Sequence, residues 1–278
     1  MTVEELLVFG KSKVHSDYAK ILLGDLLNLN PLELLVHLDD IVDQEKIDIY
    51  KKELDAMVME KPLQYVLGYT NFYGNKFIVN ENVLIPRFET EELVENTIKY
   101  IKEYLSEDID IIDLGCGSGA IGLTLKEKFP RANITLVDIS NEALSVAKKN
   151  ADNLGLLVNF KQNNMLNNID KKYDVVISNP PYIREDEEIE EIVKKNEPHI
   201  ALYAKENGLE FYNQILSTVK NNLKEKFIIA FEIGMEQKEA ITLLANKYLN
   251  DITVIAKKDM QDRDRMIFII SNNLISTN

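Results

Sequence analysis

The sequence predicts an α/β protein whose mostly parallel sheet is covered by helices on both faces and preceded by a small helical domain. After residue 108, short aliphatic and β-branched runs alternate with amphipathic segments of helical period. Residues 1–60 show the helical period only. A glycine-rich loop, "DLGCGSGAIG" (113–122), follows the first aliphatic run. We therefore expect a helical domain over residues 1–80 and an α/β domain over residues 81–278.

The first domain is predicted from apolar residues spaced three and four apart. This spacing occurs in "EELLVFG" (4–10), "DYAKILLGDLLNL" (17–29) and "QEKIDIYKKELDAMVME" (44–60). Pro31 opens a further segment, "PLELLVHLDD" (31–40), and proline is tolerated in a first helical turn. By itself this pattern indicates a small bundle without chemistry of its own, and it leaves partner binding open.

A change of pattern after residue 62 predicts a linking β-hairpin. The segment "FYGNKFIV" (72–79) is rich in aromatic and β-branched residues around a glycine. The next helix carries Glu89, Glu91 and Glu92 in its first turns, which suits the positive end of a helix dipole.

Seven strands are predicted in the second domain, with helices in four of the six intervals between them. The expected strands are 109–115, 133–140, 157–162, 173–178, 226–233, 251–257 and 265–271. The expected helices are 118–129, 140–154, 208–224 and 235–248. A sheet of this kind binds ligands outside the carboxyl ends of its strands, where the strand order reverses.

The glycine loop predicts a cofactor site. Gly115, Gly117 and Gly119 form G-x-G-x-G, and glycine lets the backbone approach a ligand closely. Alone, this pattern also fits a nicotinamide dinucleotide. The loop is not G-x-G-x-x-G, however, and Asp138 ends the next strand, where an acid holds ribose hydroxyls. These features fit an adenosine compound without a pyrophosphate, such as S-adenosylmethionine, and we read Cys116 as a small filler in the loop.

A stiff corner, "NPPY" (179–182), follows the strand "YDVVIS" (173–178), which we expect beside the cofactor strand. Pro180 and Pro181 fix φ and lack an N–H, and they push the residues before them toward extended geometry. The side-chain oxygen of Asn179 and the carbonyl of Pro180 can then each accept one hydrogen from a planar –NH₂ group. Such acceptors strengthen as positive charge builds on the nitrogen, which favours the transition state. Tyr182 can pack its ring against the flat group.

This motif selects a planar amine for methylation. It does not distinguish a glutamine amide from the exocyclic amine of adenine or guanine. Two other interpretations stay open. The motif could be a turn that merely ends a strand, or the protein could bind the cofactor without enzymatic activity.

The chain resembles the peptide chain release factor glutamine methyltransferases over nearly its whole length. The resemblance is carried by "PLQYVLGYTNFYGNKFIVNENVLIPRFETEELVE" (62–95), "DLGCGSGAIG", "VDISNEALSVAKKNA", "VVISNPPYI", "EPHIAL" and "FEIGMEQ", in the order of that family. It implies a Rossmann-like class I methyltransferase that moves a methyl group from S-adenosylmethionine to the glutamine amide of a Gly-Gly-Gln tripeptide. The product would be S-adenosylhomocysteine. The resemblance also implies that the N-terminal helices dock the release factor.

Site residues are carried over by motif. The family pattern places the cofactor on Gly115, Cys116, Gly117, Ser118, Gly119, Asp138 and Asn179. It assigns catalysis to Asn179, Pro180 and Tyr182, and it assigns substrate binding to these residues with Pro181 and Arg87. In "NNML" (163–166), Asn164 or Met165 would flank the adenine, where the family often has Asp and an aromatic residue. Phe88 stands where the family often has proline, and Arg87 either walls the active site or forms a plain surface ion pair.

Charge and composition favour a protein substrate in the cytoplasm. The net charge of −14 is negative in both predicted domains, which lowers the expectation of nucleic-acid binding. The sequence has no basic N-terminal stretch typical of a signal peptide and no apolar run near the ~18 residues of a membrane helix. The single cysteine excludes an intramolecular disulfide, and the three histidines show no metal-ligand spacing. We expect a monomer.

Two charged segments remain. "EDEEIEEIVKK" (185–195) predicts a solvated helix that could border the substrate opening, and "QDRDR" (261–265) predicts a turn. Nucleic-acid amine methylation and methylation of a ribosomal-protein glutamine stay open as alternative functions.

Overall fold

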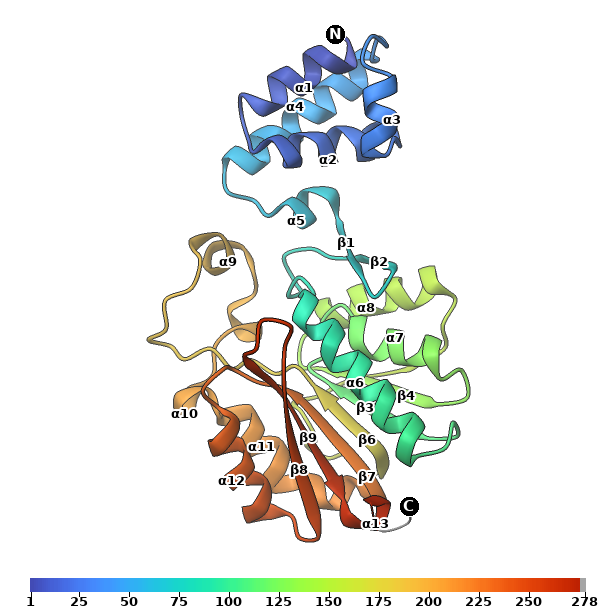
Figure 1. The fold of residues 1–278 in the computed structure, drawn as a ribbon, viewed down its shortest axis with the longest axis vertical. Helices are drawn as coiled ribbons and strands as arrows, with labels where there is room; N and C mark the ends of the chain where they lie inside the picture. The colour runs from blue at the N-terminus through green and yellow to red at the C-terminus, as the bar shows by residue number, and fades with distance from the viewer. Residues whose placement is uncertain (276–278) are drawn as a thin grey trace. The chain divides into compact units, whose positions relative to one another are not determined.

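A computed structural model describes residues 1–275 of the chain (Figure 1). It contains two compact units. The smaller comprises Met1–Tyr69 with Ile189–Asn196, and the larger comprises Thr70–Glu188 and the chain from Glu197 onward. The boundary predicted near residue 80 thus lies inside the larger unit, because the hairpin belongs almost wholly to it. No helix of the described residues is long and apolar enough to cross a membrane.

The smaller unit is helical. Its elements are α1 (Val3–Lys11), α2 (Ser16–Leu27), α3 (Pro31–Val36), α4 (Gln44–Val58), α5 (Leu63–Leu67) and α9 (Glu191–Asn196). Thr2 and Glu5 form a reciprocal capping box that starts α1. Asn30 and Glu33 repeat this arrangement at α3, where Pro31 occupies the first turn. The predicted helices are present, although the segment that begins at Pro31 ends as a helix at Val36.

Tyr50 lies at the centre of this unit. It is fully buried, and its hydroxyl donates to the carbonyl of Ala19 over 3.1 Å. A Cβ at Gly10 would lie 2.1 Å from that hydroxyl, so α1 can approach α4 only with glycine there. The segment predicted as a solvated helix over residues 185–195 is largely exposed but helical only over Glu191–Asn196. Lys195 pairs with Glu60, which attaches α9 to the end of α4.

The larger unit begins with the predicted hairpin, β1 (Tyr69–Phe72) and β2 (Asn75–Ile78). Tyr73 and Gly74 form its turn, with φ of 50° and 83°. Positive φ at both central residues matches the twist of a two-residue hairpin.

The seven-stranded sheet follows. Its strands are β3 (Asp110–Leu114), β4 (Asn133–Asp138), β5 (Asn159–Gln162), β6 (Tyr173–Ser178), β7 (Leu223–Glu232), β8 (Ile252–Lys258) and β9 (Asp264–Ser271). The order is β5-β4-β3-β6-β7-β9-β8. Four of the strand pairs are parallel, and β9 runs antiparallel to both β7 and β8, which confirms the prediction of a mostly parallel sheet.

Helices cover both faces of this sheet (Figure 1). One hydrophobic core is formed with α6 (Phe88–Tyr104), α7 (Ala120–Lys128) and α8 (Asn141–Leu154), and the other with α11 (Glu210–Thr218) and α12 (Lys238–Tyr248). Along β3, Ile111 joins the first core and the next residue, Ile112, joins the second, as strand alternation requires. The remaining elements are the short helices α10 (Lys205–Gly208) and α13 (Asn272–Ile275) and the 3₁₀ turns His199–Ala201 and Val219–Asn222. The helix predicted over 208–224 is therefore shorter.

The strand order reverses beside β3. The chain passes from β3 outward through β4 and β5 and then returns to β6 on the other side of β3. The carboxyl ends of β3 and β6 are thus neighbours at the switch point, where sheets of this class hold their ligands. The predicted adjacency of "YDVVIS" and the cofactor strand is confirmed.

Candidate active site

The glycine loop leaves β3 with three residues in the left-handed region. Gly115, Gly117 and Gly119 have φ of 71°, 53° and 81°. A Cβ at Gly115 or Gly117 would meet no atom within 4 Å, so these two glycines leave an open cradle in front of the backbone. At Gly119 a Cβ would lie 3.1–3.3 Å from side-chain atoms of the core. The first two glycines therefore serve the open side of the loop, and the third serves close packing.

Asp138 closes this loop from the end of β4. One carboxylate oxygen accepts from the amide of Gly117 and the other from the amide of Ser140, each over 2.9 Å. Burial raises the pKa of Asp138, and the backbone hydrogen bonds partly offset that effect. The acid holds the loop and also lines the cavity in front of it.

Asp113 lies behind the loop and is completely buried. Its Oδ2 accepts from the amide of Gly122 over 3.0 Å, whereas its Oδ1 has no partner among the described residues. Burial and the nearby charge of Asp138 raise the pKa of Asp113 to about 7. This carboxylate fixes the start of α7.

The Asn-Pro-Pro-Tyr corner begins directly after β6. The hydroxyl of Ser178 donates to the carbonyl of Leu114 over 2.6 Å, which joins the ends of β6 and β3. Pro180 is buried, while Asn179 and Pro181 face the same cavity as Gly115 and Gly117. The two predicted motifs therefore meet at one place.

That cavity has a volume of about 260 Å³. Six predicted site residues line it: Gly115, Gly117, Asp138, Met165, Asn179 and Pro181. Asn164 lines it too, so both candidates for the adenine contact are present. Asn163 donates to the carbonyl of Met165 over 3.0 Å and holds Met165 at a φ of 48°. Phe211 of α11 adds an aromatic side chain that the sequence did not reveal.

Three residues of the predicted cofactor set lie behind the lining of this cavity. Cys116 is buried in the core, where burial raises the pKa of its thiol, which fits the role of a filler. Ser118 is 3% exposed, and its carbonyl accepts from Asn150 over 2.9 Å. Asn150 also pairs with the backbone of Ile78, so it ties the hairpin to the glycine loop. Gly119 packs against the core as described above.

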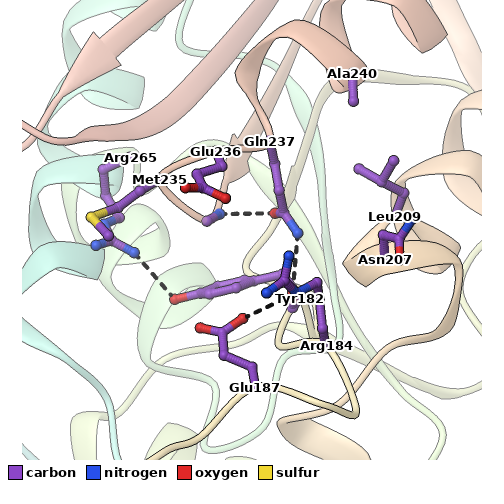
Figure 2. A pocket seen from close by; sticks show the side chains of 11 residues that line it. Tyr182, Arg184, Glu187, Asn207, Leu209, Met235, Glu236, Gln237, Ala240 and Arg265 are labelled. Carbon is purple, nitrogen blue, oxygen red and sulfur yellow. Dashed lines mark hydrogen bonds and ion pairs between the residues drawn. The ribbon is translucent and has the colours of Figure 1, made fainter.

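Tyr182 faces a second cavity, of about 680 Å³, shown in Figure 2. Its hydroxyl donates to Glu232 Oε1 over 3.2 Å, and Arg265 Nη1 donates to that hydroxyl over 3.5 Å. Its carbonyl accepts from Gln237 Nε2 over 3.0 Å. Burial and the charge of Glu232 raise the pKa of Tyr182, while Arg265 opposes them. Tyr182 is thus held at its hydroxyl and at its backbone carbonyl.

Arg87 forms an ion pair with Glu197. The Glu197 side chain is 1% exposed and also accepts from the amide of Ile85 over 3.1 Å. Pro198, which follows Glu197, lines the smaller cavity. Arg87 therefore supports the wall of the site through a buried partner, which differs from a plain surface ion pair.

The sequence assigned no functional role to three residues near Tyr182 and Asn179: Thr90, Glu232 and Arg265. Glu232 ends β7, and an acid at the carboxyl end of a strand is the same signal that identified Asp138. Arg265 lies in the segment predicted as a turn. The turn occupies residues 260–262, and Arg265 already belongs to β9, where it pairs with Asp259.

The fold and the site together define a Rossmann-like class I methyltransferase. Residues 88–203 match the family model of the methyltransferase small domain, and residues 12–68 match the PrmC N-terminal domain. A methyltransferase from Pyrococcus furiosus has a TM-score of 0.54 at 15% identity and covers 80% of this chain and 98% of its own, which shows the common fold.

The family follows from two relatives. A release factor glutamine methyltransferase of Bacillus cereus is 37% identical over 255 residues, with 90% of each chain covered. Another from Streptococcus pneumoniae is 41% identical over 224 residues, covering 80% of this chain and 78% of its own. The chain belongs to the release factor glutamine methyltransferase family.

Proposed function

We propose that this protein transfers the methyl group of S-adenosylmethionine to the side-chain amide nitrogen of glutamine in the Gly-Gly-Gln tripeptide of release factors. The observation that carries the proposal is one cavity lined both by the glycine loop and by the Asn-Pro-Pro-Tyr corner. The two relatives, both release factor glutamine methyltransferases, support it. We expect the protein to act in the cytoplasm as a monomer.

The cradle fits the cofactor. Open space in front of Gly115 and Gly117 admits a ligand against the backbone, and the Asp138 carboxylate at the cavity suits ribose hydroxyls. Asn164 or Met165 would flank the adenine. When bound, S-adenosylmethionine supplies an activated methyl group on a sulfonium.

Asn179 and Pro180 would hold the substrate nitrogen. An amide nitrogen is a poor nucleophile because its lone pair is delocalised. Two carbonyl acceptors that bind its hydrogens orient it and become stronger partners as positive charge develops. The proline-stiffened backbone keeps these acceptors in place. Pro181, in the wall of the cavity, would pack against the flat amide. Tyr182 faces the other cavity, so it would anchor the corner through Glu232 and Gln237 in place of the ring packing expected from the sequence. Arg87 would keep the adjoining wall in position.

The helical unit would dock the release factor. Four apolar side chains on α3 and the segment after it are 62–86% exposed: Leu32, Leu35, Val36 and Ile41. Such exposure of apolar groups is typical of a contact surface. Replacing Leu32 and Val36 with serine should raise KM for an intact release factor and leave the methylation of a short Gly-Gly-Gln peptide unchanged.

A labelling experiment tests the proposed reaction. The protein is incubated with methyl-labelled S-adenosylmethionine and, separately, with release factors, ribosomal proteins, DNA and RNA. We expect label in the release factor, lost when its tripeptide glutamine is changed to alanine. Label in nucleic acid alone, or in a ribosomal protein alone, would replace our proposal with the corresponding alternative.

A further inference from the structure

A buried chain of side chains leads away from Asn179. The Asn179 amide nitrogen donates to Thr90 Oγ1 over 3.2 Å, and the Thr90 hydroxyl donates to Glu232 Oε2 over 2.7 Å. Thr90 is 4% exposed and Glu232 is 2% exposed. Neither residue lines the cavity that Asn179 faces, so both reach it only through Asn179.

The hydrogen bonds in this series all run in one direction, from Asn179 to Thr90 and from Thr90 to Glu232. The Thr90 hydroxyl has a single proton, and the carboxylate of Glu232 takes it. The hydroxyl oxygen therefore offers only lone pairs to Asn179. Asn179 must turn its NH₂ toward Thr90, because its carbonyl oxygen would find no donor there. The carbonyl oxygen of the same amide is left for the opposite side.

The other carboxylate oxygen of Glu232 is also a hydrogen-bond acceptor. It accepts from the hydroxyl of Tyr182 over 3.2 Å. Arg265 Nη1 donates to that hydroxyl over 3.5 Å, so the tyrosine proton points to Glu232 (Figure 2 shows the Arg265–Tyr182 contact). Glu232 thus accepts from both neighbours, and a glutamine in its place can match only one of them.

We propose that Thr90 and Glu232 are positioning residues that hold the Asn179 carboxamide with its oxygen toward the substrate nitrogen. The inference rests on the proposed function of Asn179. It goes beyond that function, because it assigns two buried residues outside both motifs to the orientation of the acceptor. Without Thr90 and Glu232, the amide can present its NH₂ to the substrate, and two donors would then face each other.

Four single variants test the assignment. Thr90→Val removes the hydroxyl at nearly constant volume, and Thr90→Ser keeps it. Glu232→Gln keeps the shape but adds a donor. Thr97→Val is the matched control: Thr97 lies in the same helix, is fully buried, and its hydroxyl donates only within that helix, to the carbonyl of Leu93 over 2.7 Å.

We expect Thr90→Val and Glu232→Gln to lower kcat at least thirtyfold. The dissociation constant of S-adenosylmethionine, measured by calorimetry, and the thermal midpoint should stay near those of the wild type. Thr90→Ser and Thr97→Val should keep kcat within threefold. In an Asn179→Ala background, measured with labelled cofactor, Thr90→Val should cause no further loss, since nothing is left to orient.

Clear results would overturn the assignment. These are a Thr90→Val enzyme within threefold of the wild type, a Thr90→Ser enzyme as impaired as Thr90→Val, or fully additive losses with Asn179→Ala. Should Thr90→Val unfold, Glu232→Gln decides the question by the same criteria. A wild-type enzyme that methylates no glutamine would contradict the proposed function instead, so the two failures are distinguishable.

Discussion

The carboxyl groups at the two ends of the parallel strands have pKa values shifted in opposite directions. At the carboxyl end, Asp113 and Glu232 are buried and Asp138 is half-buried, and removal from solvent raises the pKa of each. At the amino end, Asp110 begins β3 and lies between Lys171 Nζ and Lys224 Nζ, at 2.7 and 2.6 Å. Lys224 also pairs with Asp174 of β6 over 2.7 Å. Burial tends to raise the pKa of Asp110, but the two lysines outweigh it and hold that pKa below its ordinary value.

The difference separates an end that stabilises from an end that binds. At the amino end, ion pairs of the carboxylates join β3, β6 and β7, and the charged form of these groups stabilises the folded state. Carboxylates at the carboxyl end hold backbone amides and hydroxyls in one orientation, although burial disfavours their charge. Changes at the carboxyl end should therefore affect catalysis more than folding, and changes at the amino end should do the reverse.

Replacing Asn179 with alanine should give the largest effect. Losing one acceptor aimed at developing charge should lower kcat roughly a thousandfold, because such acceptors act mainly on the transition state. The affinity for S-adenosylmethionine should fall only modestly and the thermal midpoint should barely move. Single-turnover transfer, calorimetric titration and thermal unfolding measure the three quantities. Turnover close to that of the wild type would remove Asn179 from the chemistry.

Two glycines of the loop region should respond differently to alanine. A Cβ at Gly117 would project into the open cradle, so Gly117→Ala should weaken cofactor binding about tenfold at a cost of about 1 kcal/mol for its positive φ. A Cβ at Gly122 would lie 2.2 Å from Leu136 Cδ2, so Gly122→Ala should destabilise the fold by about 2–3 kcal/mol. Calorimetry and urea unfolding would show whether the two losses separate. Equal destabilisation by both variants would contradict the division of roles within the loop.

Much of the fold could be predicted because local patterns specify it. The alternation after residue 108 gives the strands and helices, and the switch point follows from the topology of parallel sheets. Helix ends were less accurate. The helix from Pro31 ends at Val36, and the helix predicted over 208–224 is shorter, because tertiary packing sets such ends.

The candidate site was predictable only where the motif is contiguous. Gly115, Gly117, Asp138 and Asn179 follow strands directly, so their convergence can be argued from the sequence. Thr90 and Glu232 are separated from Asn179 by long stretches of chain, and only the packing of α6 and β7 brings them together. The role of Arg87 depended in the same way on Glu197, which no local pattern connects to it.

At the amino end, Asp110→Asn should destabilise the protein by about 1 kcal/mol at neutral pH. The pKa of Asp110 is lower in the folded state, so its stabilisation is present above the unfolded pKa and is lost as pH falls through the folded pKa. The difference between wild type and variant should thus begin to shrink as pH falls below the unfolded pKa of ~3.9, and it should vanish only below the lower pKa of the folded state. Urea unfolding across pH measures it. The control is Asp108→Asn, because the exposed ion pair of Asp108 with Arg131 should contribute almost nothing to stability. An equal loss of stability in both variants would show that the ion pairs at the amino end of the sheet stabilise no more than a surface pair.

The smallest effect, and one of opposite sign, is expected for Asp113→Asn. The pKa of Asp113 is raised to about 7, so the folded state takes up a proton that the unfolded chain releases, and wild-type stability increases as pH falls from above 7 toward 4. Removing the charge should therefore stabilise the protein at pH 8, by less than about 1 kcal/mol because the new amide N–H₂ would lack an acceptor. The gain should shrink toward pH 5, where the wild-type carboxyl is already neutral. A variant clearly less stable at pH 8 would mean that the buried carboxylate supports the fold as Asp110 does, and the contrast between the two ends would not hold for the glycine loop.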